Sequence, residues 1–216
     1  MEDRHEAPVQ PATHAKVRIL DTANRLFYNE GVHSVGIDRI IAEAGVTKTT
    51  LYKYYKSKEL LTVSYLQLRD NYVRDIVASL QAQTEDPIER LHLLVEAIAG
   101  EAEKPDFRGC PFINATAQFS DPQHPVRLAI TEHRRWYSEQ VEHMFRDAGH
   151  PDPLQARDDF FLARDGAYAS ANLGDPATAT AALRRMTGRL IGQASGGQAS
   201  GGQASGGQAS GGHSEA

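Results

Sequence analysis

Residues 37–60 read IDRIIAEAGVTKTTLYKYYKSKEL, and this stretch decides the fold. Before Gly45, apolar residues recur at helical spacing, which predicts a short helix that ends at this glycine. After it, Thr47 is a helix-capping residue, and Leu51 and Tyr55 lie four residues apart, so they share the inward face of a second short helix. The stretch therefore predicts two short helices joined by a tight turn, the helix-turn-helix arrangement.

The same stretch concentrates positive charge. It holds lysines at positions 48, 53, 56 and 58 and no acidic residue between Gly45 and Glu59, although the whole chain carries a net charge of −5. A local excess of cations in an acidic chain is what a contact with a polyanion requires, because phosphates attract cations. The alternative is a solvent-exposed helix face, which explains most charge runs. Composition alone leaves both interpretations open.

The segment after the second helix adds a further indication. Ser57 is a cap candidate, and it predicts a helix that starts at Lys58. The helix dipole favours anions at that end, so a lysine there is mismatched, and a bound phosphate would offset the mismatch. The second helix of a helix-turn-helix fits the major groove of DNA, so both observations point to the same class of partner.

A family resemblance covers about 45 residues. The segment ILDTANRLFYNEGVHSVGIDRIIAEAGVTKTTLYKYYKSKELL, residues 19–61, is similar almost position by position to the DNA-binding domain of TetR-family transcriptional regulators. The strongest pieces are the AxxLF pattern at 23–27, IIAEAGV at 40–46 and TLYKYYKSKELL at 50–61. One departure is Gly36, where the family usually has a capping Ser or Thr. The helix that starts after Gly36 is therefore expected to rely on Ser34 for its cap or to fray at this end.

The resemblance implies roles for the residues of the second helix and its flanks. Positions that reach base edges in such proteins hold Lys48, Thr49 and Lys53. Positions that contact phosphates hold Thr47, Thr50, Tyr52, Tyr54 and Lys58. Phosphate contacts position a protein on the duplex, whereas base contacts specify the sequence. For each of these residues the alternative is an ordinary exposed side chain.

Apolar residues recur at helical spacing along most of the chain, and no period-two pattern competes, which predicts an all-α fold of about nine helices. Composition divides the chain further, because the N-terminus is polar and QASGG recurs four times near the C-terminus. The expected parts are a flexible arm (1–13), a helix-turn-helix DNA-binding domain (14–58), a helical ligand-binding and dimerisation domain (59–192) and a disordered repeat tail (193–216).

The last two expected helices, about 154–173 and 177–191, have faces suited to close packing. Small residues stand in register at Ala163, Gly166, Ala167 and Ser170 on the first, and the second carries Leu183, Met186, Thr187 and Leu190. These faces fit either packing within the chain or a four-helix bundle with a second copy. The resemblance implies a homodimer through these helices. Two recognition helices about 34 Å apart would then reach successive grooves of a pseudo-palindromic operator in double-stranded DNA.

The resemblance also implies an enclosed small-molecule effector of unknown identity. Candidate lining residues are Tyr65, Cys110, Phe112, Phe119, Trp136, Tyr137 and Met144, each of which is equally compatible with plain core. RGCPFINA, residues 108–115, resembles the start of the sixth helix in a subset of these regulators. The single cysteine there suggests an electrophile or redox sensor, with a small buried hydrophobe as the alternative.

The sequence carries no catalytic constellation, no metal-ligand spacing and no cofactor motif, so an enzyme is not expected. No signal peptide or membrane-spanning run is found, which favours a cytoplasmic protein without a membrane partner. The sequence thus predicts a repressor that a small molecule releases from its operator. The alternatives are a regulator that responds to electrophiles or redox state through Cys110, and a non-enzymatic helical module that binds proteins.

Overall fold

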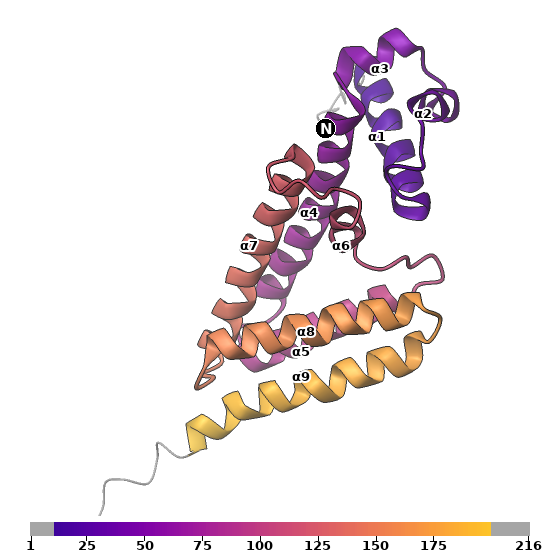
Figure 1. Cartoon of the computed structure of the whole chain (residues 1–216). Coiled ribbons are helices and arrows are strands. Elements are labelled where there is room, and N and C mark those ends of the chain that lie inside the picture. The colour runs from indigo at the N-terminus through magenta and orange to yellow at the C-terminus, as the bar shows by residue number, and fades with distance from the viewer. Residues whose placement is uncertain (1–10, 200–216) are drawn as a thin grey trace, which may run out of the picture.

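The computed structural model describes residues 11–199, with side chains from 14 to 194. Over this range the chain is all helical, as predicted, and forms a small head at one end of a longer body (Figure 1). The helices are α1 (Pro11–Glu30), α2 (Ile37–Ala44), α3 (Lys48–Tyr54), α4 (Lys58–Gln83), α5 (Pro87–Ala102), α6 (Pro111–Thr116), α7 (Pro125–Asp147), α8 (Pro153–Asn172) and α9 (Pro176–Ala199).

The head consists of α1, α2 and α3, which pack on one another around a small apolar core. The turn between α2 and α3 depends on Gly45, whose left-handed backbone (φ 61°) ends α2 while its N–H donates to the carbonyl of Ala42. Leu51 and Tyr55 are buried in the core, as their spacing predicts. At the other end of α2, Gly36 is the N-cap and supplies no side-chain hydrogen bond, because glycine has no side chain to offer.

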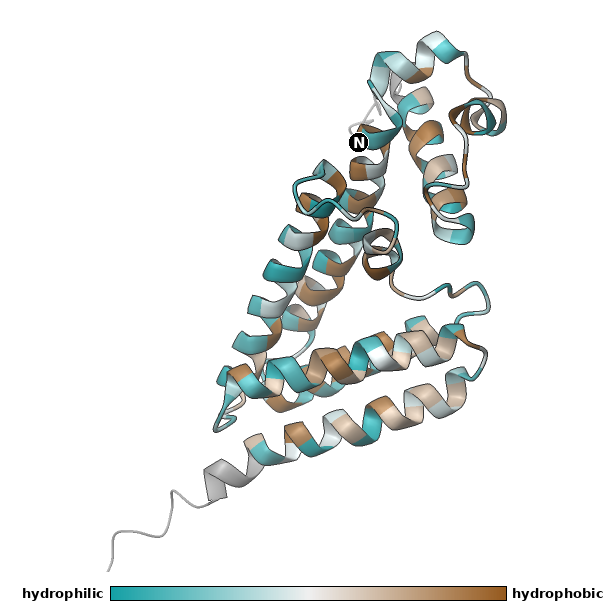
Figure 2. Cartoon of the chain, viewed as in Figure 1, coloured by the Kyte–Doolittle hydropathy of each residue, from teal (hydrophilic) through white to brown (hydrophobic). Residues whose placement is uncertain are grey.

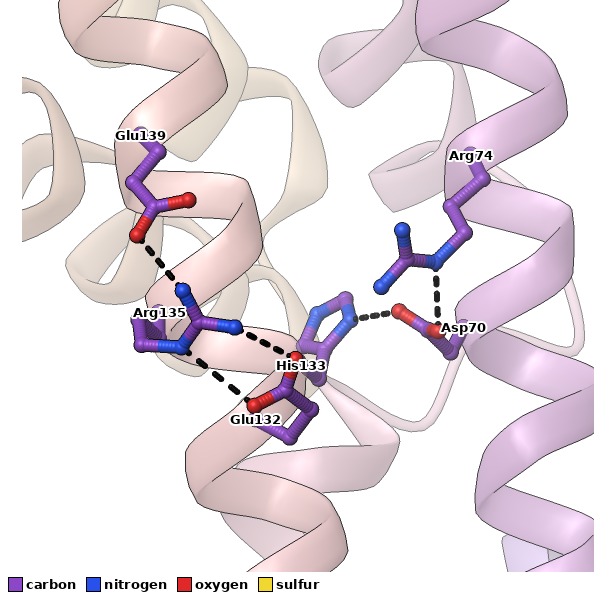
Figure 3. A network of polar contacts seen from close by, with 6 residues as sticks. All are labelled: Asp70, Arg74, Glu132, His133, Arg135 and Glu139. Carbon is purple, nitrogen blue, oxygen red and sulfur yellow. Dashed lines mark hydrogen bonds and ion pairs between the residues drawn. The ribbon is translucent and has the colours of Figure 1, made fainter.

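The body is built on α4, which leaves the head and lies beside α7 (Figure 1). A polar contact ties these two helices together, because Asp70 of α4 faces the buried His133 of α7 at 2.7 Å (Oδ1 to Nδ1) and also accepts from Arg74 at 2.6 Å (Figure 3). Below them α5, α8 and α9 pack together, so that α8 and α9 form the end of the body far from the head (Figure 1).

Proline marks where the body helices begin. The helices α5 to α9 each start at a proline, whose missing N–H and fixed φ suit the first helical position. The residue before it caps the helix in several cases. Asp86, Asp152 and Asp175 each accept a hydrogen bond from a backbone N–H of the first turn. The Pro-containing breaks of the sequence therefore become the joints between body helices.

Several boundaries differ from the sequence-based ones. Helical spacing predicts Phe119 on the same helix as Phe112, but α6 ends at Thr116, so Phe119 lies in the segment that follows this helix. The helix α1 already begins at Pro11, and α9 continues past residue 191 to Ala199, through the first repeat and into the second. The other residues of the predicted arm and tail, 1–10 and 200–216, lie outside the described residues.

The small residues of α8 divide between two environments. Ala163 and Ala167 are buried within the chain, where α8 packs mainly on α9, whereas Gly166 and Ser170 are exposed. On α9, Leu183 and Thr187 are buried and Met186 is exposed. Intramolecular packing thus uses part of these faces and leaves another part at the surface.

Each helix of the described chain carries both hydrophilic and hydrophobic residues (Figure 2). Brown and teal residues alternate along α4, α7 and α8, as expected for helices with one buried face. No helix among residues 11–199 is long and apolar enough to cross a membrane.

Candidate nucleic-acid interface and ligand cavity

The short helix α3 is held by its cap and by one buried face. Thr47 caps it, since its Oγ1 accepts from the N–H of Thr50 at 3.1 Å, and the two hydroxyls lie 2.8 Å apart. Leu51 is fully buried, and the Tyr55 hydroxyl donates to the carbonyl of Lys16 on α1 at 3.3 Å. Anchored in this way, α3 presents its opposite face to solvent. The predicted caps Thr47 and Ser57 are both confirmed.

The residues predicted to contact DNA come together on this outer face and at the start of α4. Five of them are exposed, namely Thr47, Lys48, Thr49, Tyr52 and Lys53. Thr50, Tyr54 and Lys58 are half-buried. The ribbon of α3 is mainly white to teal, in keeping with a polar surface (Figure 2).

Two arginines of the head, Arg25 and Arg39, form ion pairs, whereas the lysines around α3 do not. Arg39 bonds to Glu30 and Glu43, and Arg25 also bonds to Glu43, so these side chains neutralise one another. The lysines 48, 53, 56 and 58 form no ion pair with any residue between 14 and 194. Their charge is therefore uncompensated and lies at the tip of the head. We call these four residues the lysine strip.

Lys58 occupies the first position of α4, after the cap Ser57, whose Oγ accepts from the N–H of Leu60 at 3.1 Å. Burial lowers the pKa of Lys58, because the ammonium loses part of its hydration without gaining a carboxylate. The positive end of the helix dipole adds to this cost. An anion at this position would relieve both effects.

A cavity of about 70 Å³ lies inside the body. Its walls come from α4, α5 and α8, from the segment 107–112, and from Tyr137 of α7. The head also contributes one residue, Tyr28 of α1. Tyr72, which is 45% exposed, lines both this cavity and an adjoining hollow that Lys104 and Asp106 also line. The face of α4 that carries Tyr72 and Ile76 is thus part of the cavity wall.

Two arginines are the main polar groups of the cavity. Arg164 is 6% exposed and stacks on the ring of Tyr168, with its Cζ 4.2 Å from the ring centroid. The pKa of Arg164 is raised although burial acts to lower it, because the ionisable groups Cys110, Tyr168, Tyr137 and Asp165 surround its guanidinium. Arg69 stacks on the ring of Tyr28, with its Cζ 4.3 Å from the ring centroid. Burial raises the pKa of Tyr137 to about 12, so this phenol stays neutral.

Tyr28 connects the head to the cavity. Its hydroxyl donates to the carbonyl of Gly109 at 3.1 Å and accepts from the N–H of Arg108 at 2.9 Å, both in the loop before α6. Burial raises the pKa of Tyr28, which keeps the phenol protonated. The same ring stacks under Arg69 of α4. One side chain of α1 therefore contacts two walls of the cavity.

The predicted ligand-contacting residues fall into three groups. Phe112 and Tyr137 line the cavity between α4, α5 and α8. Cys110 is buried and lines neighbouring hollows, one of which it shares with His133. The other four candidates do not line this cavity. Tyr65 packs against Phe27, and Phe119 packs against His33 and His124. Arg74 stacks on the ring of Trp136, and Met144 is in the core.

Sequence reasoning missed the cavity residues Tyr28, Arg69, Arg164 and Tyr168. A signal existed for Arg164, because a charged pair, Arg164 and Asp165, interrupts the otherwise apolar stretch FFLARDGAY, residues 160–168. Tyr28 had no such signal, since it reads as an ordinary residue at the end of the first helix. Among the described residues, no group of three or more His, Cys, Asp or Glu side chains is placed to hold a metal ion.

Comparison with known proteins identifies the family. The family model described as "Bacterial regulatory proteins, tetR family" matches residues 19–63, which run from the middle of α1 to the first turns of α4. The solved structure of SCO4454, a TetR-family transcriptional regulator from Streptomyces coelicolor, is 36% identical, covers 85% of this chain and 97% of its own, and superposes with a TM-score of 0.82. This chain belongs to the TetR family.

Other relatives of this TetR-family chain match over shorter ranges. LmrA, a helix-turn-helix transcriptional regulator of Bacillus subtilis, is 26% identical over 137 residues, which are 62% of this chain and 73% of LmrA. The uncharacterised regulator YxaF of the same organism is 26% identical over 121 residues, which are 54% of this chain and 63% of YxaF. These proteins are transcriptional regulators, so the chain is a regulator and not an enzyme.

Proposed function

We propose that this TetR-family regulator is a repressor that binds a pseudo-palindromic operator as a homodimer and leaves it when a small molecule fills the cavity. The observation that carries the DNA-binding part is the lysine strip, whose charge no acidic side chain among residues 14–194 neutralises. Polyanions are attracted to such a surface, and duplex DNA is the one that fits a helix-turn-helix. Because the chromosome lies in the cytoplasm, that location is part of the proposal.

The exposed face of α3 supports a division of roles. Lys48, Thr49 and Lys53 stand where a recognition helix reaches base edges, and all three are exposed. Lysine pairs with guanine O6 and N7, and the methyl group of threonine contacts that of thymine. Lys58 and Tyr52 flank this face and would contact phosphates, together with Thr47, Thr50 and Tyr54. In this division, phosphate contacts set affinity and base contacts set sequence preference.

The homodimer is supported by apolar side chains at the surface of α8 and α9. Leu162 is 73% exposed, Leu173 is 88% exposed and Met186 is 51% exposed. A Cβ added at Gly166 would meet no atom within 4 Å, so this exposed position leaves room for close approach of another helix. Exposed apolar residues gathered on two neighbouring helices are typical of an interface. Two copies joined there would form a four-helix bundle.

Release of DNA requires that an occupant of the cavity change the position of the heads. The route we propose runs through Tyr28 and Arg69, because Tyr28 belongs to the head and Arg69 to α4, and the two stack in the cavity wall. A molecule that enters between these walls would move α1 relative to the loop 107–110. The effect on operator affinity equals the difference between the affinities of the molecule for the two states.

The DNA-binding part is tested by gel shift with the full chain and with operator fragments selected from random-sequence DNA. Binding should fall steeply between about 50 and 200 mM salt, because each neutralised phosphate releases counterions. Lys58→Ala should reduce the salt slope by roughly one contact. Arg135→Ala is the control, since it removes one positive charge from α7, where Arg135 pairs with Glu132 and Glu139 of the same helix (Figure 3). Equal effects of both variants, or no binding at low salt, would overturn the proposal.

A further inference from the structure

The chemical class of the effector follows from the charges in the cavity wall. We propose that the effector is an organic acid, an apolar molecule whose carboxylate is bound by Arg164 and Arg69. This inference gives the proposed function its ligand class and rests on that function for its regulatory meaning. The binding itself is independent of DNA and is tested separately below.

Arg164 is a buried cation with incomplete pairing. Its Nη1 donates to Asp165 at 2.6 Å, but Asp165 also accepts from Arg134 at 2.9 Å, so one carboxylate serves two guanidinium groups. Its buried Nε meets no acceptor among the described residues. A buried charged group that lacks partners is costly, and a bound anion would supply the missing acceptor. Because Arg164 lines the cavity, the anion would be reached from inside it.

Arg69 repeats this arrangement on the opposite helix. Its buried Nε has no hydrogen-bond partner in the part of the chain that is described, and no carboxylate lies within ion-pair distance there. Its guanidinium stacks on the ring of Tyr28 and lies 5.9 Å from the ring centroid of Tyr65, so its partners are aromatic side chains and not carboxylates. The planar guanidinium binds carboxylates through two parallel hydrogen bonds, which suits the edge that remains.

The one carboxylate that lines the cavity does not neutralise these cations. Glu101 accepts from Lys104 at 2.6 Å and from the Tyr72 hydroxyl at 3.2 Å, so it is already engaged at the rim. The remaining walls are mainly apolar and aromatic, for example Val77, Ile98 and Phe112. A wall that is apolar apart from excess positive charge fits a molecule with a hydrophobic body and one acid group.

The mouth of the cavity provides the space that such a molecule needs. Small-molecule sites usually enclose at least about 300 Å³, more than the cavity holds. An adjoining hollow of about 220 Å³ shares Tyr28, Arg69 and Tyr72 with it. Tyr72 is half exposed between the two, so rotation of its side chain would join them. The acid would then lie beside the Tyr28–Arg69 stack, where the head meets the body.

The test is calorimetric titration of the full chain with matched pairs of probes. Octanoate, decanoate, 2-naphthoate and 4-phenylbenzoate are each compared with the neutral primary amide of the same skeleton, near pH 8, where carboxylates are ionised. At least one acid should bind, about tenfold or more tighter than its amide, as a charge-assisted pair implies. Binding of the amides with equal strength, or binding of none of the acids, would overturn the inference.

Three variants locate the acid group. Arg69→Met removes the guanidinium but keeps an unbranched side chain, and it should bring the affinity for an acid down to that for its amide, whereas Arg164→Lys should weaken the preference for acids. Arg90→Met is the control, because Arg90 also has a buried Nε without a described partner but lies outside the cavity. Circular dichroism verifies that each variant is folded. An unchanged acid preference in both cavity variants would refute the assignment.

Gel shift without any probe distinguishes the two proposals. If the wild-type chain does not bind DNA, the proposed repressor function is refuted, whereas the calorimetric result on acid binding still stands. Normal DNA binding combined with equal affinity for acids and amides would refute the ligand class alone.

Discussion

Replacing Tyr28 with phenylalanine isolates the contact between head and body. The substitution keeps the ring on which Arg69 stacks and removes only the hydroxyl. That hydroxyl makes two hydrogen bonds to the loop before α6, one to the carbonyl of Gly109 and one from the N–H of Arg108. Gly109 is buried, so its carbonyl would lose this partner without access to bulk water.

The magnitude follows from these two bonds. A hydrogen bond contributes about 0.5–1.5 kcal/mol, and a buried group left without a partner costs about 1–3 kcal/mol. Tyr28→Phe should therefore lower the free energy of unfolding by about 2 kcal/mol. The measurement is urea denaturation followed by circular dichroism, with the denaturant slope expected to stay unchanged.

The control is Tyr52→Phe, which removes a phenolic hydroxyl from an exposed site of the same head. Its effect on stability should stay within about 0.5 kcal/mol, as for most surface substitutions. A Tyr28→Phe protein as stable as this control would refute the view that the hydroxyl fastens the head to the body. Hydrogen exchange gives a second readout, because the amide of Arg108 should exchange faster in the variant.

Four further outcomes are expected. Lys53→Ala should change which bases are preferred in selected DNA fragments, whereas Lys58→Ala should weaken binding to all fragments alike in gel shift. Gly36→Ser should raise the free energy of unfolding by about 0.5–1 kcal/mol in urea denaturation, since its backbone is extended and a serine hydroxyl would cap α2. Leu173→Glu should shift the chain from dimer to monomer in analytical ultracentrifugation. Burial lowers the pKa of His133 in the folded chain, so as the pH falls this histidine is protonated first in the unfolded chain. The free energy of unfolding should therefore decrease as the pH drops below about 6.5, and it should decrease less steeply in His133→Gln.

The local features of the fold were predictable because each depends on a few neighbouring residues. Thr47 and Ser57 cap helices wherever the next turn has free N–H groups, and Gly45 ends a helix through its own backbone freedom. Leu51 and Tyr55 are buried because helical spacing puts them on one face. These signals need no knowledge of the rest of the chain.

The cavity was not predictable in the same way, because its walls come from segments far apart in sequence. Tyr28 lines it only because the loop 107–110 passes beside α1, and no local pattern encodes that meeting. Trp136 and Met144 are of residue types that often line binding sites, but they pack elsewhere, since spacing alone does not distinguish core from cavity wall. Arg164 is intermediate, as its charge among apolar neighbours marks it as unusual without revealing its partners.

The helix α4 provides a route by which a molecule bound in the body would affect DNA binding by the head. It runs without a break from Lys58 to Gln83, so its cavity wall and its DNA-facing end belong to one rigid element. Lys58 and Arg69 are eleven residues apart, which corresponds to about 16 Å along the axis. The contact of Asp70 with His133 fixes α4 to α7 one residue beyond Arg69 (Figure 3). A displacement of Arg69 would therefore turn α4 about this contact and move Lys58 relative to the phosphates, while the Tyr28 stack carries the same displacement into α1.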